Sequence, residues 1–282
     1  MSWLAEAMRA AGEGAALRAR VRPLAALLAA AGDRAPPRGF AAALRPAGGA
    51  GAAGADDLPA VIAEIKFVSP TLGVLRRSRD VETVARAYAD AGAAALSILV
   101  DAPRFAGHPD HLTRARRACP LPLLAKGFFA DPYQLAEMRL AGADAVLLIA
   151  AALSPARLAE LHAAAGEFGL DALVELHDAA DVARLAGLAP RLVGVNHRSL
   201  DTLILDPGVS AALVGGLPAG AVRVAESGLT TRGDLARMAA LGYDAVLVGT
   251  ALMQSGNPGA ALATLRRPPA DVTFREVRHG AV

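Results

Sequence analysis

The feature that most restricts how this chain can fold is a regular alternation of short apolar segments with amphipathic helical patterns, starting at residue 61. Each apolar segment has the length of a buried strand and is followed by a polar or Pro/Gly-containing turn. There are eight of them, at residues 61–66, 94–100, 122–126, 145–150, 172–177, 192–196, 222–226 and 245–250. Eight successive β/α units predict a (β/α)8 TIM barrel.

The segments between the predicted strands have helical periodicity, most clearly at 81–91, 131–141, 154–168 and 231–240. A short phrase recurs where a helix meets the next strand: AGAAAL at 91–96, AGADAV at 141–146 and LGYDAV at 241–246. Its glycine suits a left-handed helix cap, and the repetition marks repeated αβ units. No G-x-G-x-x-G follows the first strand, which disfavours an open dinucleotide-binding sheet.

Ahead of the barrel, residues 3–32 have helical spacing, Pro36-Pro37 ends that pattern, and residues 40–44 allow one more short turn. Residues 46–57 are rich in Gly and Ala and predict a linker. We therefore expect an N-terminal helical extension and linker over 1–60, a catalytic barrel over 61–267 and a C-terminal tail over 268–282.

Composition excludes several classes of protein. The 29 basic and 27 acidic residues leave a net charge of +2, and the absence of a long basic run argues against a nucleic-acid partner. Charges at Glu6, Arg9 and Glu13 interrupt the first apolar stretch, so we expect no signal peptide and no membrane partner. The single cysteine, Cys119, fits a reducing cytoplasm. No long apolar surface stretch stands out, and a monomer or weak homodimer is expected.

Only two of the 29 basic residues are lysines, and Lys66 and Lys126 both fall at the ends of predicted strands. Strand ends are often polar, but charged groups inside a packed barrel need partners, and the carboxyl ends of barrel strands form the catalytic mouth. A titratable ammonium is also something that arginine cannot replace. The other polar residues at strand ends are Glu64, Glu175, Asn196, Arg198, Glu226 and Ser227.

The ends of the last two strands predict a phosphate site. Ser227-Gly228 and Gly249-Thr250 place small residues where backbone N–H groups can approach an anion. No metal-ligand cluster is visible. His177 and His197 lie near the mouth, but we expect them, by alternation with Glu175 and Asn196, to point away from it.

The strand-end motifs resemble those of the indole-3-glycerol phosphate synthase family of tryptophan biosynthesis. EIKFVSP at 64–70 is similar to the family's E-I-K-x-x-S-P signature. The likeness continues, over roughly residues 20–266, through LSILVD at 96–101, PLLAKGFF at 122–129, ALVELH at 172–177, GVNHRSL at 194–200, AESG at 225–228 and VGTALM at 248–253.

The resemblance implies a carboxy-lyase that closes the ring of 1-(2-carboxyphenylamino)-1-deoxyribulose 5-phosphate to indole-3-glycerol phosphate, releasing CO2 and water and using no cofactor or metal. It implies that Lys126 is the acid at the ketone, that Lys66 is a second acid, and that Glu175, or Glu64, is the base or stabiliser. It places Ser69, Pro70, Phe128, Asn196, Arg198 and Glu226 around the substrate, and Ser227, Gly228, Gly249 and Thr250 around its phosphate.

The chain departs from the family pattern at three places. Gly127 stands where an Asp is common, Leu72 where S-P-S-K-G has Lys, and Asn196-His197-Arg198-Ser199 where N-N-R-N is common. Two alternatives stay open, and only the second is suggested by these departures. One is another phosphate-binding barrel enzyme, either an isomerase or a Schiff-base lyase using Lys126; an isomerase would want a Cys/Asp pair, for which Cys119 is badly placed. The other is a specialised or inactive paralogue.

Overall fold

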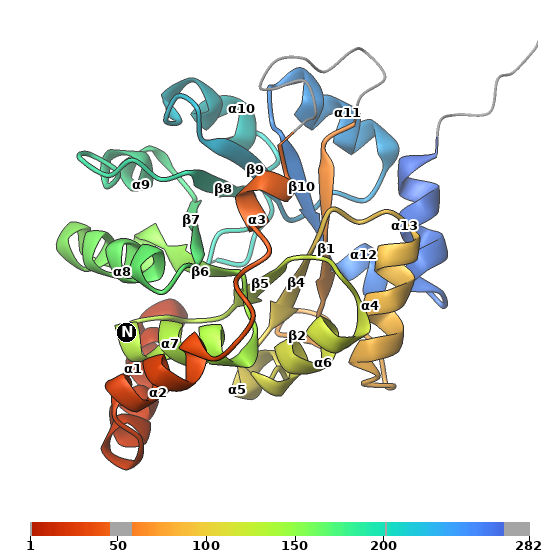
Figure 1. Cartoon of the computed structure of the whole chain (residues 1–282). Helices are drawn as coiled ribbons and strands as arrows, with labels where there is room; N and C mark the ends of the chain where they lie inside the picture. Colours follow the sequence, from red (N-terminus) through yellow and green to blue (C-terminus); the bar gives the residue numbers. More distant parts are fainter. Residues whose placement is uncertain (1, 46–57, 201, 268–282) are drawn as a thin grey trace, which may run out of the picture.

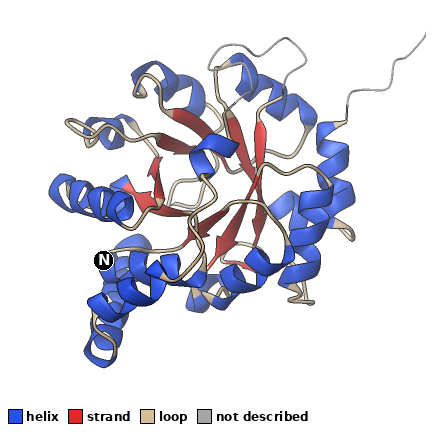
Figure 2. Cartoon of the chain, in the orientation of Figure 1, coloured by secondary structure: helices blue, strands red, loops and turns tan. Residues whose placement is uncertain are grey.

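Eight parallel strands close into a barrel, with helices around its outside (Figures 1 and 2). The computed structural model describes residues 2–45, 58–200 and 202–267. The predicted TIM barrel is confirmed, and each of the eight predicted strands is present. In barrel order from the first they are β1 (Ala60–Ile65), β4 (Ala95–Leu99), β5 (Leu123–Lys126), β6 (Ala145–Ile149), β7 (Asp171–Leu176), β8 (Leu192–Asn196), β9 (Val222–Glu226) and β10 (Ala245–Val248).

The helices that the periodicity predicts are also present, within one or two residues of the expected ends. Side-chain caps fix their first turns: Asp131, Ser154 and Thr231 each accept a hydrogen bond from a backbone N–H of the helix that follows. The helices of the barrel are α4 (Val81–Asp90), α5 (Ala102–Phe105), α6 (Asp110–Ala118), α7 (Pro132–Ala141), α8 (Pro155–Glu167), α9 (Ala179–Ala183), α10 (Val209–Leu213), α11 (Arg232–Ala240), α12 (Thr250–Met253) and α13 (Pro258–Arg266), with 3-10 turns η1 (Ala150–Ala152) and η2 (Val214–Gly216).

The recurring sequence phrase has a structural basis. Its glycines, Gly92, Gly142 and Gly242, all have positive φ angles, between 82° and 102°. In two of its copies an aspartate then ties the new strand to its neighbour. Asp144 accepts a hydrogen bond from the Leu123 N–H at 2.8 Å, and Asp244 accepts one from the Arg223 N–H at 2.9 Å. All three copies therefore end a helix, and the two with aspartate also fix the register of the next strand.

The N-terminal extension consists of α1 (Trp3–Val21), α2 (Leu24–Gly32) and α3 (Phe40–Ala43). The helical stretch predicted over 3–32 divides at Arg22, whose φ and ψ of −131° and 106° are extended, because the following Pro23 disfavours a helical residue before it. The helix α3 buries Phe40 completely, and its Ala41 N–H donates to Asp171 at the amino end of the barrel (Figure 1). The predicted linker at 46–57 and tail at 268–282 lie outside the described residues.

Asp144 is a buried carboxylate at the amino end of the barrel. Its carboxylate pairs with Arg116 at 2.7 Å and also accepts the backbone N–H groups of Arg38 and Leu123. Replacing Asp144 with alanine leaves these donors unsatisfied, and we expect a loss of about 3–5 kcal/mol in the free energy of unfolding. Urea denaturation measures this loss. Asp90→Ala, at an exposed position of α4, is the control and should change the free energy by less than about 0.5 kcal/mol.

Candidate active site

A cavity of about 630 Å³ opens at the carboxyl ends of the strands. Every residue predicted for the site lines it except Glu226, which is fully buried behind Lys126. Barrel closure therefore brings together side chains that lie far apart in the sequence. The predicted residues that line the cavity are Glu64, Lys66, Ser69, Pro70, Lys126, Phe128, Glu175, Asn196, Arg198, Ser227, Gly228, Gly249 and Thr250.

At the centre of the cavity floor, Lys126 lies between two glutamates. Its Nζ donates a hydrogen bond to Oε2 of Glu226 and lies 3.5 Å from Oε2 of Glu175. The second lysine forms its own pair, with Nζ of Lys66 at 2.6 Å from Oε1 of Glu64. The lysine side chains keep 15–16% exposure while the glutamates are almost completely buried. Each ammonium group therefore has a carboxylate beneath it and the cavity in front of it.

The surroundings shift the pKa values of these groups in different directions. Burial opposes charge on Lys126, but the carboxylates of Glu226 and Glu175 outweigh it and raise the lysine pKa. Burial and the neighbouring Glu175 carboxylate together outweigh the Lys126 ammonium and raise the pKa of Glu226 to about 7. Burial acts the same way on Glu175, but Lys126 and His177 outweigh it and lower that pKa to about 2. Near neutral pH, Glu175 is a carboxylate and Lys126 an ammonium, while Glu226 holds a proton more readily than an ordinary glutamate.

Buried polar atoms without hydrogen bonds gather inside this barrel. In the described part of the chain they are Oε2 of Glu175, Oε1 of Glu226, Nε2 of His177 and Oγ of Ser97. Buried polar groups are nearly always hydrogen-bonded, so a concentration of exceptions calls for an explanation such as catalysis. Three of these four atoms belong to the side chains around Lys126, and two of the three lie in ion pairs at 3.3–3.5 Å.

His177 does not line the cavity, but the prediction that its side chain alternates with that of Glu175 is wrong. His177 is two residues after Glu175, so the two side chains share a strand face, and Nε2 of His177 lies 3.3 Å from Oε1 of Glu175. The corresponding prediction for His197 is confirmed. Its ring nitrogens lie 2.9 Å from the Ser227 carbonyl and 2.6 Å from Oγ of Ser210, behind the cavity wall.

Two glycines leave room for the buried glutamates. A Cβ atom at Gly249 would lie 2.4 Å from Oε1 of Glu64, and one at Gly194 would lie 2.3 Å from Oε1 of Glu226. Gly249, predicted for its backbone N–H, thus also has a packing role. Gly127 is confined less tightly, since a Cβ there would lie 2.8 Å from Cγ2 of Val100.

Gly194→Ala is predicted to move the Glu226 carboxylate away from Lys126. The added methyl group occupies the position of Oε1, and the fully buried side chain has little free space to relax into. We expect kcat to fall about tenfold, as for the loss of a hydrogen bond to a charged group. Steady-state kinetics measures the change. Gly215→Ala, at a position with no atom within 4 Å of the new Cβ, is the matched control and should retain kcat.

One wall of the cavity is aromatic, and only Phe128 of this wall was predicted. Trp3, from the N-terminal helix α1, meets Phe128 edge-on at 5.6 Å between ring centroids, and Phe105 stacks on it at 6.5 Å. The guanidinium of Arg104 lies 5.5 Å from the Trp3 and Phe128 rings. That Trp3 is the only tryptophan of the chain was the one available sequence signal for its role.

Loops complete the remaining walls. A two-stranded hairpin, β2 (Val68–Ser69) and β3 (Gly73–Val74), follows β1 and carries Leu72, which is exposed at the rim. On the opposite loop, the Arg198 guanidinium donates to the Leu203 carbonyl at 2.8 Å. Ser227 and Gly228 both have positive φ angles, of 70° and 73°. Such backbone is uncommon for a residue with a side chain and is often found at functional sites.

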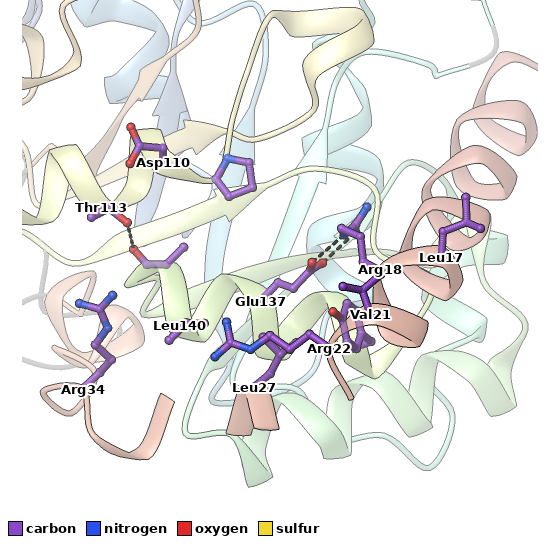
Figure 3. A pocket seen from close by; sticks show the side chains of 13 residues that line it. Leu17, Arg18, Val21, Arg22, Leu27, Arg34, Asp110, Thr113, Glu137 and Leu140 are labelled. Atoms are coloured by element: carbon purple, nitrogen blue, oxygen red, sulfur yellow. Dashed lines mark hydrogen bonds and ion pairs between the residues drawn. The ribbon is translucent and has the colours of Figure 1, made fainter. Parts of the chain in front are cut away.

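A second cavity, of about 680 Å³, lies between α1, α2, α6 and α7 (Figure 3). Its polar contacts include the ion pair of Arg18 with Glu137 at 2.6 Å and the hydrogen bond from Thr113 to the Ala141 carbonyl. No strand end reaches it, so it contains none of the predicted chemistry. Within the described ranges, no group of three or more His, Cys, Asp or Glu residues is placed to hold a metal ion. No helix among those residues is long and apolar enough to cross a membrane.

The closed barrel and the charged cavity at its carboxyl end define a TIM-barrel enzyme. A family model described as indole-3-glycerol phosphate synthase matches residues 10–265. The chain belongs to the indole-3-glycerol phosphate synthase family, as its motifs predicted.

Curated relatives named indole-3-glycerol phosphate synthase align with this chain over most of their length. The chain is 48% identical to the indole-3-glycerol phosphate synthase of Rhizorhabdus wittichii, over 81% of this chain and 84% of the relative. It is 47% identical to that of Albidiferax ferrireducens and 46% identical to that of Rhodospirillum rubrum, each over 86% of this chain and 90% of the relative. Among solved structures, a 3-hexulose-6-phosphate synthase shares the fold with a TM-score of 0.58 and 18% identity, over 73% of this chain and 98% of the other.

Proposed function

We propose that the chain catalyses the indole-3-glycerol phosphate synthase reaction, the closure of 1-(2-carboxyphenylamino)-1-deoxyribulose 5-phosphate to indole-3-glycerol phosphate. The observation that carries the proposal is the buried Lys126 ammonium, held by Glu226 and Glu175 and exposed only toward the cavity. Membership in the family supports the same activity.

The lining of the cavity suits the three parts of this substrate. The phosphate would lie at the ends of β9 and β10, where the backbone at Ser227, Gly228 and Gly249 approaches closely. The aromatic ring would lie against the wall of Trp3, Phe105 and Phe128. Its carboxylate would face Arg198, Asn196 and Ser69, which line the same cavity and offer charged and neutral donors.

In the first step, the aromatic carbon that bears the carboxylate attacks the ketone carbon. The new C–C bond forms as the carbonyl oxygen takes a proton, and the bond to the carboxylate then breaks to release CO2 and restore the aromatic ring. Lys126 supplies the proton, because its raised pKa keeps it an ammonium until the oxygen becomes basic. Glu226 lies behind Lys126 and would hold it in position rather than touch the substrate.

In the second step, the hydroxyl group leaves as water and the ring loses a proton to form the indole double bond. An acid must protonate the hydroxyl and a base must accept the ring proton. Lys66 is the remaining ammonium in the cavity and would be the acid. Glu175, which lines the same cavity and is ionised near neutral pH, would be the base. Glu64 holds Lys66 as Glu226 holds Lys126.

The structure disfavours the Schiff-base alternative on one point. A lysine that attacks a carbonyl must be a neutral amine, and neighbouring carboxylates raise the pKa of Lys126. The Gly127 and Leu72 departures leave the pairs around Lys126 and Lys66 in place. We therefore favour an active synthase over an inactive paralogue.

The test is to incubate the purified full chain with the carboxyphenylamino-deoxyribulose phosphate and follow indole fluorescence. We expect the fluorescence to increase in proportion to enzyme and CO2 to be released in equal amount. A preparation that is folded by circular dichroism but yields no indole product would contradict the proposal. Loss of substrate with covalent trapping by borohydride would instead support the Schiff-base lyase.

We also propose that the enzyme works in the cytoplasm as a monomer or weak homodimer. The one cysteine of the chain, Cys119, is buried and unpaired, and supports a reducing compartment. Sedimentation velocity across a range of protein concentrations measures the oligomeric state.

A further inference from the structure

A row of buried charged side chains runs from the helix α9 to the centre of the active site. It begins at Asp181, passes through His177 and Glu175 and ends at Lys126. Nδ1 of His177 lies 3.3 Å from Oδ2 of Asp181, and Nε2 lies 3.3 Å from Oε1 of Glu175. Oε2 of Glu175 then lies 3.5 Å from Nζ of Lys126. His177 itself does not line the cavity, so any effect on the reaction passes through Glu175.

Asp181 is held firmly enough to orient the imidazole. Its Oδ2 accepts the His177 backbone N–H at 2.9 Å, and its own N–H donates to Asp178, the cap of α9. Its Oδ1 lies 3.6 Å from Nε of Arg184, and the whole residue is buried. A carboxylate fixed on one ring nitrogen determines which way the other nitrogen points.

The two oxygens of Glu175 therefore have different surroundings. Oε1 faces His177, whereas Oε2 faces Lys126 and makes no hydrogen bond to the described residues. The carboxylate therefore lies between two cations, with the imidazole of His177 beside Oε1 and the ammonium of Lys126 beside the buried Oε2.

We propose that His177 is a positioning residue of the synthase reaction, which is oriented by Asp181 and holds the Glu175 carboxylate in place beside Lys126 through the contact at Oε1. The inference rests on the proposed function, because it assigns a role within that reaction. The high pKa of His177, about 10, agrees with it: burial would lower the value, but Asp181 and Glu175 outweigh burial and keep the ring charged.

The other charged groups around Glu175 determine what a pH measurement would report. Lys126 from β5 favours the ionised carboxylate, and Glu226 from β9 and Glu64 from β1 oppose it. Asn196 from β8 lies beside it as a neutral hydrogen-bonding group. Removing the imidazolium takes away one of the two cations that favour the ionised carboxylate, so the pKa of Glu175 must rise.

The test compares His177→Leu, which removes the donor, with His177→Gln, which keeps a neutral donor. We expect kcat to fall about tenfold in His177→Leu, with KM changed less than twofold and a smaller loss in His177→Gln. In both variants the acid limb of the kcat profile should move to higher pH, because a larger fraction of Glu175 is protonated there. His162→Gln, on α8 away from the cavity, is the matched control and should keep the wild-type profile.

The outcomes separate this inference from the proposed function. If the wild type makes no indole product, the function itself is overturned. If the wild type is active and His177→Gln, folded by circular dichroism, keeps the wild-type kcat and acid limb, only the role of His177 is overturned. If His177 acts only in folding, both variants should melt at lower temperatures and lose the same fraction of kcat at every pH. That result also overturns the inference.

Discussion

Replacing Lys126 with arginine is expected to lower kcat by about 10²–10⁴-fold, the range for loss of a positioned general acid. Arginine keeps a positive charge beside Glu226 and Glu175, so the buried carboxylates stay compensated. It cannot release a proton near neutral pH, however, and its planar guanidinium does not fit a site built around a compact ammonium. Turnover measured by indole fluorescence at saturating substrate tests the expectation.

Two further measurements make the Lys126→Arg result specific. The melting temperature of the variant, measured beside its turnover, separates lost chemistry from lost folding. Lys66→Arg provides the matched comparison, since Lys66 pairs with only one glutamate, Glu64, at the cavity edge. Near-normal turnover in Lys126→Arg would mean that this lysine is not the acid, even if the family activity is present.

The barrel and much of the site were predictable because both follow from local patterns. Each strand has its own apolar run and turn, and closure of eight parallel strands places their carboxyl ends at one mouth. Lys66 and Lys126 converge for that reason alone, although 60 positions separate them in the sequence.

The features that the sequence did not predict depend on tertiary contacts, which leave no periodic pattern of apolar residues. Trp3 reaches the cavity because α1 packs beside the barrel, and nothing near residue 3 indicates that packing. The hairpin formed by β2 and β3 is too short for a hydrophobic pattern. The orientation of His177 could have been predicted, because side chains two residues apart on a strand, such as those of Glu175 and His177, lie on the same face.

The roles of the two glutamates beside Lys126 are also set by the fold. Glu175 and Glu226 both lie at strand ends and have the same side chain, and the resemblance placed Glu226 around the substrate, whereas it does not line the cavity. In the structure Glu226 is sealed behind Lys126, while Glu175 lines the cavity and has His177 on its other side. The pKa of Glu226 is about 7 and that of Glu175 about 2, because of these surroundings.

Glu175→Gln is expected to lower kcat by about 10²–10⁴-fold, because the amide keeps the shape of the carboxylate but accepts no proton. KM should change much less, since the phosphate and aromatic parts of the substrate are held by other residues. The matched control is Glu160→Gln, which removes an exposed carboxylate paired with Arg157 on α8 and should retain kcat. Steady-state kinetics at saturating substrate gives both parameters.

Glu226→Gln should behave differently, and the contrast tests the division of roles. It removes a carboxylate that raises the pKa of Lys126, so the lysine should lose its proton at lower pH. The basic limb of the kcat profile is then expected to move down in pH, with a smaller loss at the optimum than in Glu175→Gln. Equal losses in the two variants, with no movement of the basic limb in Glu226→Gln, would show that the glutamates act as one unit. Glu175 could then no longer be assigned as the base and Glu226 as the residue that holds Lys126.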